Sequence, residues 1–293
     1  MSRLRAPALT LGTFLLASLV SLCAGAPSMA AGSQSVSTNW AGYVALNTPA
    51  SSGSAGGFSS VSGTWKQPAA SCAAGSESYS AAWVGLGGYA ESARALEQIG
   101  TDADCTHGGR AVYSTWFEVL PAPPVTVPLR ARPGDTISAS ATVHGLRVTL
   151  RIRDLSTGAH FSSSRSATRV DTSSAEWIIE APSVCPASSG CHTLQLANFG
   201  LASFWGATAT AHGHTGGIGD ASWSSRALEL RQGAYDIVTR RGLPVRSSSR
   251  VILATPTEAS TPAGAFSVSW REQPIAVEEA PRPTLPGFSG GES

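Results

Sequence analysis

Charge of either sign is scarce in this chain. Only 13% of its 293 residues are Asp, Glu, Lys or Arg, and 20 basic residues face 19 acidic ones. Lys66 is the only lysine, so arginine supplies the remaining positive charge. Such dilute and balanced charge produces no strong electrostatic field. The composition therefore gives no indication of nucleic acid, an acidic polymer or a charged membrane surface as a partner.

Long apolar segments are also few. Arg3 and Arg5 precede an apolar stretch from about residue 8 to residue 26, and small residues around Ala30 follow it. This order is typical of a secretory signal peptide, which we predict over residues 1–31. No other apolar run approaches the roughly 18–20 residues that span a bilayer. We therefore expect a secreted, extracellular protein that makes no membrane contact after cleavage.

Cysteines are few but even in number once the predicted leader, with Cys23, is removed. The remaining ones are Cys72, Cys105, Cys185 and Cys191. Four cysteines in an exported protein predict two disulfides, with three possible connectivities. The short spacing of Cys185 and Cys191 favours a local bond, which leaves Cys72 with Cys105. The alternative, a four-thiolate zinc site, lacks the Cys-x-x-Cys spacing of such sites.

No segment after the predicted leader shows a helical period of apolar residues between caps. Short alternating segments appear instead, separated by Gly, Ser, Pro and Asn. The clearest is Arg147–Arg153, where arginines and a threonine alternate with Val, Leu and Ile, and Asp154–Gly158 predicts a hairpin turn after it. Other strands are predicted at 80–86, 111–120, 136–143, 175–181 and 266–271.

Many short antiparallel strands predict an all-β fold. The expected architecture is a single-domain antiparallel β-sandwich or jelly roll over residues 32–271. Residues 272–293 are rich in Pro, Gly and Glu, and this composition predicts a disordered tail.

The common hydrolase signatures do not occur in a suitable context. The one Gly-x-Ser-x-Gly match, 287–291, lies in the predicted tail, where a nucleophile elbow cannot form. No His-Glu-x-x-His and no Asp-Thr-Gly segment is present. His212 and His214 are the only clustered histidines, and a solvent-facing loop is a better interpretation of them than a metal site.

Two predicted strands carry polar residues among large apolar ones. Gln98 lies between Leu96 and Ile99, after Glu97. Glu176 and Glu180 stand on either side of the apolar segment 177–179. Such burial costs free energy unless the polar group is paired or functional. Strand alternation puts both glutamates on one face. Periodicity does not choose between them, and it leaves open that they line a solvated face or pair with arginines, and that Gln98 is a satisfied core amide.

The blocks around these residues resemble the glutamic peptidases, or eqolisins. Six blocks occur in the family's order: Thr38–Gly42, Ala82–Leu86, Leu96–Gly100, Trp116–Pro121, Ala175–Glu180 and Phe199–Phe204. In the family a short cysteine-closed loop follows the fifth block, as Cys185 and Cys191 would form here. The resemblance covers about residues 38–271, and its shared order is more specific than any single block.

The resemblance implies which residues carry the chemistry. Gln98 and Glu180 match the catalytic pair, and Trp40, Trp83 and Glu118 match positions that line the substrate cleft. Glu180 would act as base towards water and then as acid towards the leaving amine, and Gln98 would stabilise the oxyanion. The expected protein is a secreted acid endopeptidase that acts on polypeptides as a monomer and requires no metal or organic cofactor.

One position departs from the family pattern. Gly87 stands where the fungal enzymes carry an aspartate, which keeps a catalytically inactive relative open as an alternative. Another alternative is a lectin-like module that binds carbohydrate or peptide by stacking on exposed tryptophans. The candidates for such stacking are Trp40, Trp83, Trp116, Trp205 and Trp223.

Overall fold

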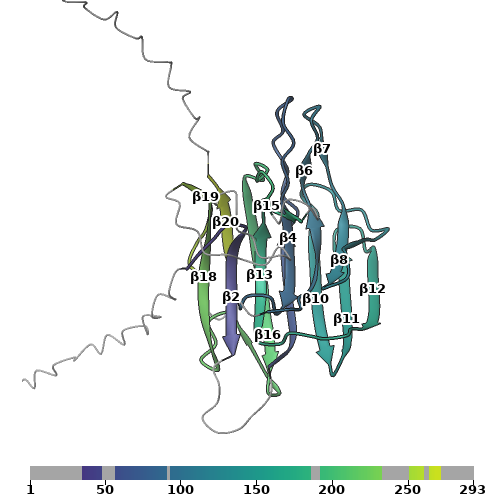
Figure 1. The fold of residues 1–293 in the computed structure, drawn as a ribbon, viewed down its shortest axis with the longest axis vertical. Coiled ribbons are helices and arrows are strands. Elements are labelled where there is room, and N and C mark those ends of the chain that lie inside the picture. Colours follow the sequence, from purple (N-terminus) through teal and green to yellow (C-terminus); the bar gives the residue numbers. More distant parts are fainter. Residues whose placement is uncertain are drawn as a thin grey trace, which may run out of the picture. The chain divides into compact units, whose positions relative to one another are not determined.

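A computed structural model describes residues 35–47, 57–90, 93–185, 192–232, 251–260 and 264–271, all within one compact unit (Figure 1). These residues form strands and turns. Among them no helix is present that could cross a membrane. The predicted signal peptide, Cys191 and the predicted tail lie outside the described residues.

The strands confirm the predicted all-β sandwich. A 16-stranded sheet folds into two layers, with neighbours hydrogen-bonded in order. Layer A holds β12 (His160–Ser166), β11 (Arg147–Asp154), β10 (Thr136–His144), β3 (Phe58–Lys66) and β16 (Leu201–Ala211). β20 (Phe266–Trp270) and β19 (Ile252–Pro256) connect it to layer B. Layer B holds β18 (Trp223–Arg231), β2 (Trp40–Asn47), β13 (Ser174–Glu180), β4 (Ala81–Leu86), β5 (Glu97–Asp102), β8 (Thr115–Val119) and β9 (Val125–Thr126).

Shorter strands extend this arrangement. β1 (Ser35–Ser37) pairs parallel with β18, and β17 (His214–Gly217) pairs with β16. Two separate hairpins are formed by β6 (Asp104–Cys105) with β7 (Ala111–Val112), and by β14 (Ser183–Val184) with β15 (His192–Thr193).

The main core lies between the two layers. Strand alternation turns Val148, Leu150 and Ile152 of β11 inward, where they join Val84 and Trp177 of layer B in one buried cluster. The intervening arginines of β11 are exposed, as the alternation predicted. Removal of these apolar side chains from water is the main favourable contribution to folding.

Layer B also buries its other face. A second cluster there includes Trp40, Trp83 and Ile178, from three adjacent strands. Every residue of β13 is consequently buried, so the strand has no solvent face. Strands buried on both sides are near-continuous apolar sequences. Ser174, Glu176 and Glu180 are the exceptions in this strand, and all three point to the second cluster's side, where Ile178 lies.

One predicted strand is two strands. The segment predicted at 111–120 divides into β7 and β8 because the chain changes partner within it: β7 pairs with β6, and β8 pairs with β5. The other predicted strands agree with the structure to within two residues. The predicted turn after Arg153 joins β11 to β12.

The predicted disulfide between Cys72 and Cys105 is confirmed. It connects the segment before β4 to β6, so it closes the chain around β4 and β5. Cys185 is also disulfide-bonded. Its predicted partner, Cys191, is outside the described residues, so that pairing stays a prediction.

The packing of layer B generates a test. A Cβ at Gly100 would lie 2.4 Å from the Ala82 carbonyl oxygen and 2.5 Å from Trp83 Cβ. We predict that Gly100→Ala lowers the free energy of unfolding by about 1–3 kcal/mol through overpacking. Chemical denaturation measures it. Gly108→Ala is the matched control, since its Cβ would meet no atom closer than 3.9 Å. Equal stability of the two variants would contradict the packing described.

Candidate active site

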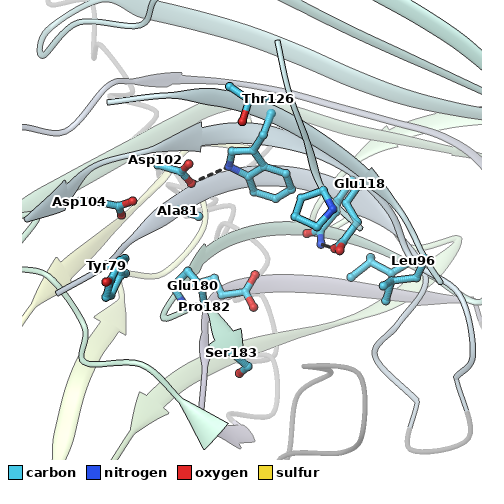
Figure 2. A pocket seen from close by; sticks show the side chains of 14 residues that line it. Tyr79, Ala81, Leu96, Asp102, Asp104, Glu118, Thr126, Glu180, Pro182 and Ser183 are labelled. Carbon is cyan, nitrogen blue, oxygen red and sulfur yellow. Dashed lines mark hydrogen bonds between the residues drawn. The ribbon is translucent and has the colours of Figure 1, made fainter. Parts of the chain in front are cut away.

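A cleft of about 340 Å³ opens on the outer face of layer B (Figure 2). Side chains from β4, β5, β8, β9 and β13 converge on it, together with residues that flank these strands. Its lining consists of Tyr79, Ala81, Leu96, Gln98, Asp102, Asp104, Trp116, Glu118, Leu120, Pro124, Thr126, Glu180, Pro182 and Ser183. None of these residues is a lysine, arginine or histidine, so the described part of the cleft contains acids without a basic partner.

Strand register brings the predicted pair into this cleft. Glu180 of β13 lies opposite Ala81 of β4, and Gln98 of β5 lies opposite Gly85 of β4. The strand between them thus presents two small residues, which leave room above the sheet. A Cβ at Gly85 would lie 3.0 Å from Trp83 Cζ3 and 3.1 Å from Gln98 Cβ, so this glycine makes space for both side chains.

The Glu180 carboxyl group is buried and held by neutral donors. Trp83 Nε1 donates to Oε2 at 2.8 Å, and Asn39 Nδ2 donates to Oε1 at 3.3 Å. Ser37 Oγ donates to Asn39 Oδ1 at 3.2 Å, which leaves the asparagine amide group facing Glu180. The Trp40 indole N–H also faces the carboxyl group, although it makes no hydrogen bond of good geometry.

Burial raises the pKa of Glu180 to about 8. The charge of Glu118 contributes to this rise, and the N–H groups of Trp83, Trp40 and Asn39 oppose it. Burial likewise raises the pKa of Glu118 to about 7, against the hydrogen bond from Gln98. Desolvation disfavours the charged form of each carboxyl group. Both groups are therefore protonated throughout the acid range.

The Gln98 side chain is oriented by Glu118. Its Nε2 donates to Glu118 Oε2 at 2.7 Å, and the two residues are register partners on β5 and β8. Gln98 is 4% exposed, and its Oε1 has no hydrogen-bond partner among the described residues. The amide thus has one fixed N–H, one remaining N–H and a free acceptor, which a water and a developing oxyanion could use.

The two tryptophans predicted to line the cleft lie beneath it. Trp40 and Trp83 are fully buried and pack edge to face with ring centroids 4.9 Å apart. They touch Glu180 rather than solvent. Of the five tryptophans considered for ligand stacking, Trp205 alone is exposed, at 37%. The cleft therefore offers little of the exposed indole surface that the lectin-like alternative requires.

Two aspartates that line the cleft, Asp102 and Asp104, were not identified from the sequence. Ser114 Oγ and Trp116 Nε1 both donate to Asp102, the latter at 2.6 Å. The Ser80 backbone N–H donates to Asp104 Oδ1 at 3.1 Å. Burial raises the pKa of Asp102 to about 6 and that of Asp104 to about 7. Their nearness to Gln98 in sequence was the available signal: alternation along β5 puts Asp102 on the face of Gln98, and β6 carries Asp104 into the cleft.

The departure at Gly87 has a structural explanation. A Cβ there would lie 2.4 Å from Asp171 Cβ, and Gly87 has a φ of 80°. Asp171 Oδ2 accepts the Gly88 N–H at 3.1 Å. A carboxylate from a distant segment thus occupies the space beside Gly87. The Asp171 N–H in turn donates to Glu97 Oε1 at 3.4 Å, next to Gln98 in the chain.

Two further acids, Glu97 and Glu176, lie on opposite faces of layer B, since Glu97 alternates with Gln98 whereas Glu176 shares the face of Glu180. Both are fully buried. Burial raises the pKa of Glu97 to about 9, and it raises the pKa of Glu176 well above its usual value, with smaller contributions from the charges of Asp171 and Glu97. Glu97 is therefore a neutral acid at neutral pH and below, and burial favours the neutral form of Glu176 as well.

The clustered histidines do not face this site. His214 Nε2 lies 2.9 Å from Asp220 Oδ2, and His212 is exposed in the turn before it. Within the described part of the chain, no three His, Cys, Asp or Glu residues are placed to hold one metal ion.

Comparisons with known proteins place the chain in a family. Residues 38–242 match the family model of the peptidase A4 family, which is more than half of the chain. No curated protein sequence matches.

Solved structures agree with the fold. The chain is similar to scytalidoglutamic peptidase bound to a peptide-based transition-state analogue, with 22% identity, a TM-score of 0.60, and coverage of 80% of this chain and 98% of that one. It is also similar to SCP-B, a member of the eqolisin family of peptidases, in complex with the tripeptide Ala-Ile-His. There the identity is 21%, the TM-score 0.58, and the coverage 80% and 98%. At these identities the likeness establishes the all-β fold alone.

The buried acids generate a test of stability against pH. Glu97, Glu118 and Glu180 all have folded-state pKa values above the ordinary 4.5. Their neutral forms thus stabilise the fold below about pH 4.5, and this contribution is lost as pH rises through 7 to 9. We predict a melting temperature that falls from pH 5 to pH 9, with a shallower fall in Glu97→Gln and an unchanged one in the exposed control Glu258→Gln. A melting temperature that rises over this range would refute the assignment.

Proposed function

Since the chain belongs to the peptidase A4 family and is thereby a glutamic-type peptidase, we propose that it is a secreted endopeptidase that works in acid with Gln98 and Glu180 as its catalytic pair. The block order predicted this family, and the family match confirms it. One observation carries the proposal. The cleft joins a buried, protonated carboxyl group to an amide with a free acceptor, and its described residues include no base other than carboxyl groups.

The raised pKa of Glu180 sets the order of proton transfers. An ordinary glutamate would be ionised above pH 4.5 and would start as a base. With a pKa of about 8, Glu180 starts as an acid. It gives its proton to the substrate carbonyl oxygen as water adds to the carbonyl carbon. The carboxylate formed then takes a proton from the added water, which yields a gem-diol and restores the acid.

The second half of the reaction uses the same group. Glu180 protonates the amide nitrogen, the C–N bond breaks, and the carboxylate takes a proton from one hydroxyl of the gem-diol. The products are a carboxylic acid and an amine, and Glu180 is protonated again. Gln98 would hold the attacking water through Oε1 and donate its remaining N–H to the oxygen that develops charge.

The polypeptide substrate is supported by the relatives. The two similar structures contain a peptide-based transition-state analogue and a tripeptide. An active enzyme, rather than an inactive relative, is supported by Asp171, which supplies a carboxylate at Gly87, where the family's own aspartate is missing. Secretion rests on the predicted leader and on the confirmed disulfide, which is typical of exported proteins.

Substitution of the pair tests the proposal directly. We expect Glu180→Gln to lower kcat/KM by about 10²–10⁴-fold because it removes the proton donor, and Gln98→Ala to lower it by about 10²–10³-fold because it removes an oxyanion donor. Cleavage of an unfolded protein at pH 4, with pepstatin present, measures both. The neutral amide suits the buried position of Glu180, so this variant should fold. If the folded Glu180→Gln variant kept wild-type activity, this result would contradict the proposal.

Glu118 generates a separate test through the pH profile. Its charge raises the pKa of Glu180, so Glu118→Gln should lower that pKa. Activity that needs protonated Glu180 falls as pH rises through this pKa, and the falling limb should therefore move to lower pH in the variant. The substituted amide oxygen can still accept from Gln98 Nε2, so the orientation is retained. Glu258→Gln should leave the limb in place. A limb that stays in place or moves upward in Glu118→Gln would contradict the assignment.

A further inference from the structure

The outer face of layer A is a continuous polar surface. Register pairing aligns side chains from β16, β3, β10, β11 and β12 in rows across it. One row consists of Trp205, Thr64, Ser138, Arg153 and His160. The next consists of Thr208, Ser62, Ser140, Arg151 and Ser162. We call these two rows the hydroxyl–arginine face.

A groove of about 550 Å³ follows this face over β3, β10, β11 and β12. Ser62, Ser140 and Ser162 line it with hydroxyl groups, and Arg151 and Arg153 line it with guanidinium groups. The two arginines are two residues apart on one strand, so their side chains emerge about 6.8 Å apart on the same side. Both are exposed.

Charge on this face has one sign. The five strands contain no glutamate and a single aspartate, Asp154. Asp154 is fully buried and accepts the N–H groups of Ser156 and Thr157 in its own turn. Within the described residues, neither Arg151 nor Arg153 forms an ion pair. Two exposed guanidinium groups thus lack an internal counter-charge, although the chain as a whole is nearly neutral.

We propose that the hydroxyl–arginine face binds an acidic glycan, a polymer of sugar units that carry carboxylate groups. A guanidinium group pairs with a carboxylate through two parallel hydrogen bonds. The rows of serine and threonine hydroxyls can both donate to and accept from sugar hydroxyls. Trp205, at the end of one row, is the exposed indole against which a sugar ring can pack.

Other polyanions suit the face less well. Nucleic-acid affinity comes from many phosphate contacts and a strongly basic domain, whereas this chain has a formal net charge of +1. Binding to an anionic membrane needs a dense basic cluster or apolar residues that insert. This face offers a groove lined with hydroxyl groups and, at the end of one row, one exposed tryptophan.

The position of the face fits a tethering role. The cleft opens on the outer face of layer B, and the hydroxyl–arginine face is the outer face of layer A, so the core separates them. A glycan bound to layer A leaves the cleft open to polypeptides. The proposal does not depend on the catalytic residues, and its test is independent of peptidase activity.

The test compares the whole chain with two double variants of equal charge. Affinity electrophoresis in gels that contain polygalacturonate measures binding, and gels with neutral dextran are the reference. We expect retention by polygalacturonate alone, weakened about tenfold by Arg151→Gln/Arg153→Gln, since each arginine makes a charge-assisted contact. Trp205→Ala should weaken it severalfold. Arg110→Gln/Arg169→Gln, which removes two exposed arginines outside the face, should keep wild-type retention.

Three results would overturn the proposal. One is a wild-type protein that polygalacturonate does not retain. Another is equal loss of retention in the two double variants, which would indicate non-specific charge attraction. The last is tighter binding to an oligothymidylate or to vesicles of anionic phospholipid than to polygalacturonate at the same ionic strength. Because all substituted positions are exposed, unchanged melting temperatures and peptidase activity verify that the variants are folded.

Discussion

The site depends on a buried carboxyl group that has no cationic side chain among the described residues of its cleft. Glu180 ends a strand whose residues are all buried, and its direct partners are the N–H groups of Trp83 and Asn39. Isolated charge in such surroundings is so costly that the group holds its proton instead. This condition needs layer B to be covered on both faces, and it needs Trp83 to lie across the sheet. Gly85, two residues along β4, leaves room for the Trp83 ring, and Gly100, the register partner of Trp83 on β5, leaves room for its Cβ.

The alternation of polar and apolar residues predicted the strands that have one solvent-exposed face. The alternation in Arg147–Arg153 specified β11, because its arginines meet water and its aliphatic residues meet the core. Alternation in β13 could not distinguish the catalytic glutamate between Glu176 and Glu180, since both point to the same buried side of that strand. Only the block order of the family singled out Glu180. Its partners then follow from strand register, which pairs residues far apart in sequence.

The remaining features needed tertiary structure. Asp171 lies against Gly87 although 84 positions separate them in the sequence, so the aspartate that position 87 lacks could not be located from the chain. The family resemblance implied that Glu180 acts first as a base, whereas its burial supports a reaction in which it acts first as an acid. Near-zero net charge likewise concealed a one-signed face, because charge distribution depends on which strands become neighbours. The secondary-structure propensity of a segment indicates neither how deeply a side chain is buried nor which strands lie next to it.

The central claim is that Glu180 keeps its proton in the acid range while Glu118 holds Gln98 in the same cleft. Carbon-13 NMR of glutamate side-chain carboxyl groups measures this directly, with the Glu180 resonance identified by its absence in Glu180→Gln. The account predicts a titration midpoint near 8 for that resonance in the ligand-free protein. A midpoint near the ordinary value of 4.5 would mean that Glu180 is ionised in mild acid, and would contradict the acid-first mechanism.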